Sequence, residues 1–406
     1  MAKNLKHRTG VKTKSGEPLR FAHPFVTTVP VGKRTTIPGV GNRMTDYIKT
    51  KLEQIPKPNR DPSMALAEII GAAGVTSIEK TNFITFHSVG DTGNAISTMP
   101  ELIATAMAGD YNIAKPALSP AFFLHLGDVD YYDNTDKGYH AQFYTPYKNY
   151  PGKIIAIPGN HDGELFKWDG TSTGQTTTLA AFEKNFCQLK PGVPPAAGTI
   201  FREMISQPAV YWVLHAPFVD IIGLYSNVAE NPGYISTPDI GQAQKDWLVK
   251  TLAAIQKDRQ NSSRKALIFA VHHPPFAGGG GHGSSTEMLA DIDDACNKGG
   301  IMPDAVLAAH AHNYQRFTRL ITFNKKKLQI PFIVCGSGGR GITTVVKADG
   351  KNKGDHIFNI SLMAYGYLLI TATPKVLTLE FYQVDSTGKK KIFDTVTVDL
   401  NANTIK

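Results

Sequence analysis

Residues able to bind metal ions occur in five short clusters that are widely separated along this sequence. The clusters are Gly90-Asp91-Thr92-Gly93, Gly127-Asp128-Val129-Asp130-Tyr131, Gly159-Asn160-His161-Asp162, His272-His273-Pro274 and His310-Ala311-His312. Carboxylate and phenolate oxygens suit hard, highly charged cations, and imidazole nitrogens suit borderline divalent ions. A carboxylate shared by two such ions holds them about 3.5–4 Å apart, a separation that serves to activate water and to hold a phosphoryl group. The clusters therefore predict a two-metal centre that cleaves phosphate esters.

The clusters also lie where strands are expected to end. Four follow apolar runs rich in β-branched residues, and His272-His273 closes such a run. Open α/β sheets bind ligands at the carboxyl ends of their strands, and a glycine before Asp91, Asp128 and Asn160 permits a sharp turn there. We therefore expect the ligands to meet at one edge, with Asp128 as the bridging ligand. The predicted ligands are Asp91, Asp128, Tyr131, Asn160, His272, His310 and His312.

Strands and helices alternate from Asn82 onward. The predicted strands are Phe83–Ser88, Ala121–Leu126, Lys153–Ile157, Val210–Leu214, Val219–Tyr225, Lys265–Val271, Ala305–Ala308 and Pro331–Cys335. The predicted helices are Ile96–Ala108, Thr177–Leu189, Asp239–Gln256 and Thr286–Asn297. An antiparallel meander is expected at Tyr367–Thr373, Val376–Val384 and Lys391–Val398. This order predicts an α/β fold, a four-layer α/β/β/α sandwich of two packed mixed sheets flanked by helices.

The domain organisation is predicted from a change in composition near residue 80. Residues 1–80 are expected to form an extension that is largely irregular and packed on the body. Short helices are expected in it at Met44–Ile55 and at Asp61–Ala73, the second with Asp61 as its cap and Pro62 in its first position. Residues 81–406 are expected to form the catalytic domain, which ends in the meander.

Composition narrows the class of protein. The 406 residues are 42% hydrophobic and 19% charged, as in a soluble globular protein. The formal charge of +9 favours anionic partners in general, but on charge alone a merely basic solvated surface is the preferred explanation. Lys/Arg-rich helices with interleaved aromatic residues do not occur, so no nucleic-acid partner is expected.

No apolar run is long enough to span a membrane, and the oligomeric state is left open. The three cysteines give no disulfide framework. We expect a soluble protein, cytoplasmic if this chain is full length and secreted or periplasmic if it is a processed form.

The ordered set of motifs resembles the calcineurin-like metallophosphoesterases over about residues 82–345. Tyr131 at the third position after Asp128, together with Gly90-Asp91-x-Gly93, makes the sequence most similar to the purple acid phosphatases. The resemblance implies two metal ions, ferric iron and a divalent iron, zinc or manganese ion. It implies that Asp91, Asp128, Tyr131 and His312 bind the ferric ion, and that Asp128, Asn160, His272 and His310 bind the divalent ion. Where that family usually has glycine before the His-x-His pair, this chain has Ala309, which would be strained if the position required a positive φ.

Residues beside the ligands are assigned to the handling of the substrate. His161 is expected to face the substrate as general acid or transition-state donor, with Asp162 orienting it. His282, in a glycine-rich loop, and Arg340, after the strand at Pro331–Cys335, are candidate phosphate contacts; a solvent-exposed arginine is the alternative for Arg340. Tyr131 has a competing interpretation as a packing partner of Tyr132.

The expected function is hydrolysis of small phosphomonoesters by in-line attack of a metal-bound hydroxide at a dinuclear centre. No serine, cysteine or aspartate nucleophile stands beside a partner base, so direct transfer to water is expected. Phosphodiester or nucleotide hydrolysis at the same site is the alternative. A metal-binding scaffold without catalysis is a third interpretation, and retention of every ligand position argues against it.

Overall fold

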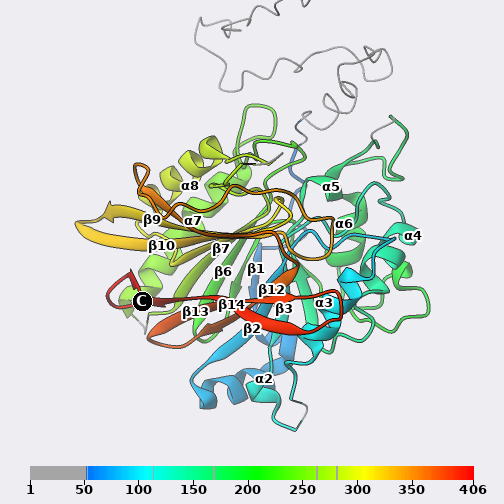
Figure 1. Cartoon of the computed structure of the whole chain (residues 1–406), viewed down its shortest axis with the longest axis horizontal. Coiled ribbons are helices and arrows are strands. Elements are labelled where there is room, and N and C mark those ends of the chain that lie inside the picture. Colours follow the sequence, from blue (N-terminus) through cyan, green and yellow to red (C-terminus); the bar gives the residue numbers. More distant parts are fainter. Residues whose placement is uncertain (1–51, 53, 113, 168–169, 262–263, 280–281) are drawn as a thin grey trace, which may run out of the picture.

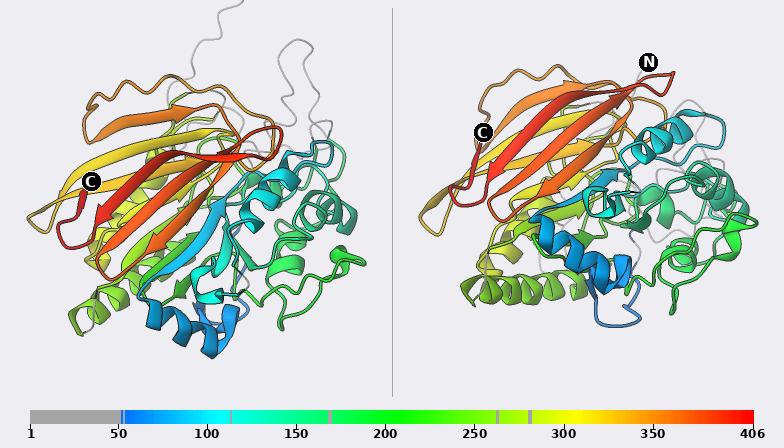
Figure 2. Two further views of the ribbon diagram at one scale, coloured as in Figure 1. Left: turned by 60° about the horizontal axis from the view of Figure 1, so that its bottom comes forward. Right: turned by 90° about the horizontal axis from the view of Figure 1, so that it is seen from below.

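Two mixed β-sheets lie face to face at the centre of the molecule (Figure 1, Figure 2). The structure, a computed structural model, describes residue 52 and residues 54–112, 114–167, 170–261, 264–279 and 282–406. One continuous apolar cluster joins side chains of both sheets, such as Ile221 and Ile268 from one and Phe86 and Ile370 from the other. Burial of this cluster between the sheets is what holds the two layers together.

The larger sheet carries the histidine clusters at the ends of two of its strands. In spatial order it contains β1 (Ser63–Ala65), β5 (Trp212–His215), β6 (Val219–Leu224), β7 (Ala266–Val271), β8 (Ala305–Ala308), β10 (Lys326–Cys335), β9 (Tyr314–Phe323) and β11 (His356–Leu362). Neighbours β6, β7, β8 and β10 are parallel. Their apolar side chains alternate between the core and the outer face, where Ile222 and Leu267 lie. Burial on both faces explains why these strands are continuous apolar runs in the sequence.

The smaller sheet carries the carboxylate clusters. In spatial order it contains β15 (Thr404–Ile405), β14 (Lys390–Asp399), β13 (Val376–Val384), β12 (Gly366–Ala372), β2 (Ile84–Val89), β3 (Phe122–His125) and β4 (Lys153–Ala156). Strands β2, β3 and β4 are parallel to one another. The predicted meander forms, and its first strand, β12, pairs antiparallel with β2. The carboxyl ends of β2, β3 and β4 therefore point to one edge of the sheet.

Helices cover both outer faces. Helices α7 (Ala243–Asn261) and α8 (Thr286–Gly299) pack on the outer face of the larger sheet, and α3 (Met99–Ala108) packs on β12 and β13 of the smaller one (Figure 1). The remaining helical segments are α2 (Ala67–Thr81), η2 (Pro116–Leu118), α4 (Asp136–Tyr139), η3 (His140–Tyr144), α5 (Asn160–Gly163), α6 (Ala180–Phe186) and η4 (Pro195–Ala197). The predicted α/β architecture of four layers is confirmed. In the part of the chain that the structure describes, no helix has the length and apolarity needed to cross a membrane.

The start of the described chain differs from the prediction. The helix expected at Asp61–Ala73 is wrong at its beginning, because Ser63–Ala65 forms β1 and the helix α2 starts only at Ala67. Strand β1 pairs in parallel with β5, and Val213 donates a backbone hydrogen bond to the carbonyl of Pro62. Residues 63–65 therefore form a strand because they pair with β5, although Asp61 and Pro62 resemble the start of a helix. The helix predicted at Met44–Ile55 lies almost entirely outside the described residues, and the domain boundary at residue 80 stays a prediction.

Candidate metal centre

The five clusters come together at the edge where the parallel strands of both sheets end. Asp91, Asp128 and Asn160 follow β2, β3 and β4 of the smaller sheet, while His272 and His310 follow β7 and β8 of the larger one. A hydrogen bond crosses between the sheets here, because Nδ1 of His272 lies 2.9 Å from the carbonyl oxygen of Leu126. The edge is thus a single site to which both sheets contribute side chains.

One group of side chains combines a carboxylate, a phenol and an imidazole. The Tyr131 hydroxyl lies 2.9 Å from Asp91 Oδ1 and 3.1 Å from His312 Nε2. His312 Nε2 lies 3.6 Å from the same Asp91 oxygen. These atoms converge on one point, so Tyr131, and not Tyr132, is the tyrosine that faces the ligand set.

A second group surrounds Asp128. His272 Nε2 lies 3.4 Å from Asp128 Oδ2 and 3.1 Å from Asn160 Oδ1, and His310 Nδ1 lies 3.0 Å from the same amide oxygen. Ligand atoms of Asp128, His272 and His310 all lie within 4.8 Å of one another, and the three residues are buried. The two groups match the division between two ions that the family resemblance implies, and the identity of each ion stays a prediction.

Backbone carbonyls orient two of the imidazoles. A carbonyl oxygen only accepts hydrogen bonds, so Nδ1 of His272 donates to Leu126 and Nδ1 of His312 donates to Gly341, each at 2.9 Å. Nε2 therefore faces the site in both rings. Such contacts at the far ring nitrogen commonly fix the tautomer of metal-binding histidines.

The backbone adopts left-handed conformations at three predicted ligands. The φ angles are 55° at Asp91, 55° at Asp128 and 67° at His310. Such angles cost a residue other than glycine of order 1–3 kcal/mol each and are concentrated at functional sites. Here they turn each side chain sharply from its strand into the shared edge.

The strain considered for Ala309 does not arise. Its φ is not among the positive ones of the described chain, and the left-handed residue is its neighbour, His310. The Ala309 methyl lies 2.5 Å from the place where a side chain on Gly90 would begin. A β-carbon on Gly159 would similarly meet Asp128 Oδ1 at 2.1 Å. Glycines 90 and 159 are therefore required by close approach, and Ala309 fills the room left by Gly90.

The carboxyl groups have strongly shifted pKa values. Burial raises the pKa of Asp91 to about 7, an effect that His272 opposes and the neighbouring Asp128 increases. Burial also opposes ionisation of Asp128, but the charges of His272 and His161 hold its pKa well below the ordinary value. Burial lowers the pKa of His310, and the surrounding imidazoles lower it further. The site thus crowds two buried carboxyl groups together, an arrangement that bound cations would relieve.

The residues fit the two metal ions that the motifs imply. Among the described residues, none donates a hydrogen bond to the buried oxygen Oδ2 of Asp91. A buried carboxylate oxygen without a donor is costly in a folded protein, and a cation removes that cost. The mixture of carboxylate, phenol, amide and imidazole donors suits iron, zinc or manganese better than calcium or magnesium.

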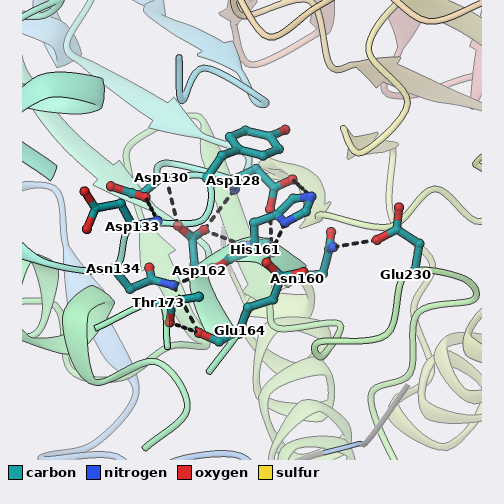
Figure 3. A network of polar contacts seen from close by, with 12 residues as sticks. Asp128, Asp130, Asp133, Asn134, Asn160, His161, Asp162, Glu164, Thr173 and Glu230 are labelled. Atoms are coloured by element: carbon teal, nitrogen blue, oxygen red, sulfur yellow. Dashed lines mark hydrogen bonds and ion pairs between the residues drawn. The ribbon is translucent and has the colours of Figure 1, made fainter. Parts of the chain in front are cut away.

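The partner of His161 differs from the predicted one. His161 lies between two carboxylates, with Nε2 4.0 Å from Asp128 Oδ2 and Nδ1 2.9 Å from Glu164 Oε2 (Figure 3). Asp162, the predicted orienting residue, accepts backbone hydrogen bonds from Gly159 at 2.8 Å and from Asp128 at 2.9 Å. The prediction for Asp162 is therefore wrong in its contact, because this carboxylate holds the turn that carries Asp128.

The two candidate phosphate contacts border the same site. His282 Nδ1 lies 3.1 Å from His310 Nε2. The guanidinium carbon of Arg340 lies 4.3 Å from the centre of the Tyr131 ring, a cation–π contact. Among the described residues, no carboxylate forms an ion pair with Arg340, so its charge is available to an anion. Contact with phosphate stays a prediction for both residues.

Two carboxylates near the site were missed by the reasoning from sequence. Glu164 lies three positions after His161, a spacing that places side chains on one helical face and could have indicated the contact. Glu230 lies in the loop after β6, with Oε2 3.5 Å from Asn160 Nδ2. This contact directs the amide oxygen of Asn160 toward His272 and His310. No pattern in the sequence signals Glu230.

Comparisons with known proteins identify the family. The model of the calcineurin-like phosphoesterases matches residues 84–314, so the chain belongs to this family, and the predicted family membership is confirmed. A purple acid phosphatase from seeds of yellow lupin (Lupinus luteus) has a similar fold, with a TM-score of 0.53 and 16% identity over 85% of this chain. This chain spans 55% of the lupin protein.

Two further solved structures are similar at lower scores. The Plasmodium protein GAP50, described as the anchor in the inner membrane complex, has 13% identity and a TM-score of 0.49, with 78% of this chain and 89% of that one covered. The protein PhoD has 12% identity and a TM-score of 0.48, with 87% of this chain and 73% of that one covered. No curated protein matches the sequence.

Proposed function

We propose that this protein is a metal-dependent phosphoesterase that hydrolyses small phosphomonoesters at a dinuclear centre, in the manner of a purple acid phosphatase. The observation that carries the proposal is the convergence of two donor groups around adjacent buried carboxylates. Asp91 and Asp128 interact directly, since the carboxylate of Asp128 raises the pKa of Asp91. Ferric iron with a divalent iron, zinc or manganese ion is the proposed pair, since a tyrosine lies only in the group of Asp91 and His312.

The ions would activate a water molecule and neutralise charge on the phosphoryl oxygens. The protein groups around them would place the ester. Arg340 and His282 border the site from two sides and would contact phosphoryl oxygens. His161 Nε2, which faces Asp128, would give a proton to the departing oxygen. The burial of His161 and Asp128 keeps this proton transfer out of bulk solvent.

Monoesters are preferred over diesters because of the charge at the rim. A monoester carries up to two negative charges and three terminal oxygens, and Arg340 adds a cation that no described carboxylate neutralises. A diester carries one negative charge and would gain less from Arg340. Phosphodiester or nucleotide hydrolysis is thus the weaker alternative on electrostatic grounds.

Hydrolysis of para-nitrophenyl phosphate, with and without a chelator, tests the proposal. We expect turnover that chelation abolishes and that iron with zinc or manganese restores. Bis(para-nitrophenyl) phosphate in the same assay tests the ester preference, and faster turnover of the diester would reverse it. A protein that binds metal ions stoichiometrically and cleaves neither ester would be a scaffold rather than an enzyme.

A further inference from the structure

His161 is held at Nδ1 by the carboxylate of Glu164, and this contact has no assigned role. We propose that Glu164 is a positioning residue for leaving-group protonation, since its carboxylate holds Nδ1 of His161 so that Nε2 faces the ester. This inference rests on the proposed function and adds to it the means by which His161 is aimed. Both side chains are buried, at 6% exposure for His161 and 1% for Glu164.

The geometry leaves the ring little freedom. Nδ1 lies 2.9 Å from Glu164 Oε2, and Nε2 lies 4.0 Å from Asp128 Oδ2. An ionised carboxylate only accepts hydrogen bonds, so Glu164 favours a proton on Nδ1. The ring also packs against Tyr131, with ring centres 4.4 Å apart, and against Tyr132 at 5.0 Å. Two aromatic rings fix the plane of the imidazole, and Glu164 decides which nitrogen faces the site.

The segment that carries both residues is fixed independently of their contact. The carbonyl oxygen of Glu164 accepts hydrogen bonds from three side chains: Asn134 at 3.2 Å, Thr173 at 2.6 Å and Gln175 at 2.9 Å (Figure 3). Asn134 also donates to the carbonyl of His161 at 3.1 Å. These donors come from segments on either side of α5, so the turn stays in place when the Glu164 carboxylate is altered.

Neighbouring acids do not serve the same purpose. Asp162 is engaged by backbone amides of the Asp128 turn, including Val129 at 3.0 Å. Glu230 Oε2 lies 3.5 Å from Nδ2 of Asn160, and ligand atoms of His161, Glu164 and Glu230 all lie within 4.8 Å of one another. The hydrogen bond at Nδ1 of His161 runs to Glu164, at 2.9 Å.

The chemical step gives Glu164 a defined task. The bond between phosphorus and the departing oxygen breaks, and its electron pair stays on that oxygen. The proton on Nε2 moves to this oxygen and yields the alcohol, while water supplies the new oxygen on phosphorus and releases a proton to solvent. Solvent then returns a proton to Nε2. Glu164 contributes by holding Nδ1, so that Nε2 stays directed at the departing oxygen.

Leaving groups of different basicity test the proposal. A poor leaving group needs the proton, so Glu164→Gln should lower kcat on phenyl phosphate by about 10- to 100-fold with little change in KM. A dinitrophenolate departs without protonation, so dinitrophenyl phosphate should be affected by less than about threefold. In a His161→Ala background the second substitution should cost nothing further, as expected for residues that act as a unit. Glu183→Gln, the same change in a half-buried glutamate of α6, should leave both rates unaltered.

The outcomes separate this inference from the proposed function. Equal losses on both esters, or an additive loss in the double variant, would overturn the positioning role while leaving the phosphatase intact. If Glu164→Gln folds poorly, Glu164→Asp should show the same dependence on leaving group with a smaller loss. If the wild type cleaves neither ester, the proposed function fails, and the contact is judged by histidine nitrogen NMR of the metal-free protein. His161 should then carry its proton on Nδ1 in the wild type and lose this preference in Glu164→Gln; an unchanged spectrum overturns the contact.

Discussion

The two sheets supply chemically different halves of one site. The smaller sheet contributes oxygen donors, the carboxylates of Asp91 and Asp128 and the amide of Asn160, whereas the larger sheet contributes the imidazoles of His272 and His310. The oxygen donors follow glycine-bearing turns, and two of them adopt left-handed backbone angles. His272 follows its strand directly and is oriented by a carbonyl of the opposite sheet.

The unfavourable electrostatic energy of the site lies mainly in the half that carries the carboxyl groups. Buried carboxyl groups destabilise one another, and their half of the edge carries the raised pKa of Asp91. In the other half, burial favours the neutral form of His310, whereas for His272 the effect of burial is overcome by the charge of Asp128, which raises the pKa of His272 to about 9. Neither half offers a complete set of donors for two ions, so the centre exists only when the two sheets are packed together. Metal binding should therefore require that the two sheets are correctly packed against each other.

The largest expected effect follows from removal of the charge of Asp128. Asp128→Asn keeps an acceptor for the His161 backbone amide, which lies 3.0 Å from Oδ1, but halves the negative charge shared by the two groups. We expect kcat on para-nitrophenyl phosphate to fall about a thousand-fold, equivalent to about 4 kcal/mol. Metal analysis should show fewer ions per chain. Asp349→Asn, on the exposed surface, is the control, and full metal content in Asp128→Asn would show that the oxygen half is not the anchor.

A smaller effect is expected at the tyrosine. Tyr131→Phe removes the hydroxyl between Asp91 and His312 but leaves the ring on which Arg340 packs. A ferric ion bound to the phenolate would give a visible absorption band, and we expect this band to vanish while kcat falls about tenfold. Tyr132→Phe is the matched control and should keep the colour. A colourless wild-type enzyme that is active with manganese would replace ferric iron with two divalent ions.

Adjacent histidines on the larger sheet should separate metal binding from stability. His273 is buried, with Nδ1 2.7 Å from Ser226 Oγ and Nε2 2.7 Å from the carbonyl of Ala229. His273→Leu removes the side-chain partner of both groups and should lower the free energy of unfolding by about 1–3 kcal/mol while metal content stays normal. His272→Leu should cost a similar free energy of unfolding, because the buried Leu126 carbonyl loses its donor, and it should also lose metal. Denaturant titration and metal analysis of both variants test this, and equal metal loss in the two would contradict these separate roles.

The sequence was sufficient to predict that Asp91, Asp128 and His272 come together, because each stands at the end of a strand that the sequence identifies. All three stand next to continuous apolar runs, and such runs are strands buried on both faces. The partner of His161 was harder, because Asp162 and Glu164 carry the same functional group within three positions. Which of the two carboxylates contacts His161 depends on the backbone amides of the Asp128 turn, because these amides donate hydrogen bonds to Asp162. Those amides point inward only because Asp128 adopts a positive φ, a property that pattern and propensity do not reveal.

The larger sheet was also only partly predictable. Strands β9 and β11 were not expected, since their residues are buried unevenly and lack a clean alternation. β1 was mistaken for the start of a helix because Asp61-Pro62 is a strong local capping signal. Both errors concern strands at or next to an edge of the sheet, and the partners of β1 and β11, β5 and β9, are distant in the sequence. The strands that precede the predicted ligands were found because burial on both faces requires a continuous apolar run, which is visible in the local sequence.

The smallest expected effect tests the contact between the two halves. The Ala309 methyl, at the end of β8, occupies the space beside Gly90, which follows β2. Ala309→Gly removes that methyl at a residue with no positive φ, so flexibility is gained without relief of strain, and we expect a loss of about 0.5–1 kcal/mol in the free energy of unfolding. Metal content and kcat should stay within about twofold of the wild type, since the backbone hydrogen bond from Ala309 to His272 is retained. Gly90→Ala places a second methyl in the same space and should cost more than Ala309→Gly, with metal loss. If the double variant Gly90→Ala with Ala309→Gly recovers metal binding, the two positions share one volume, and the fit between the sheets, rather than either glycine alone, sets the geometry of the site.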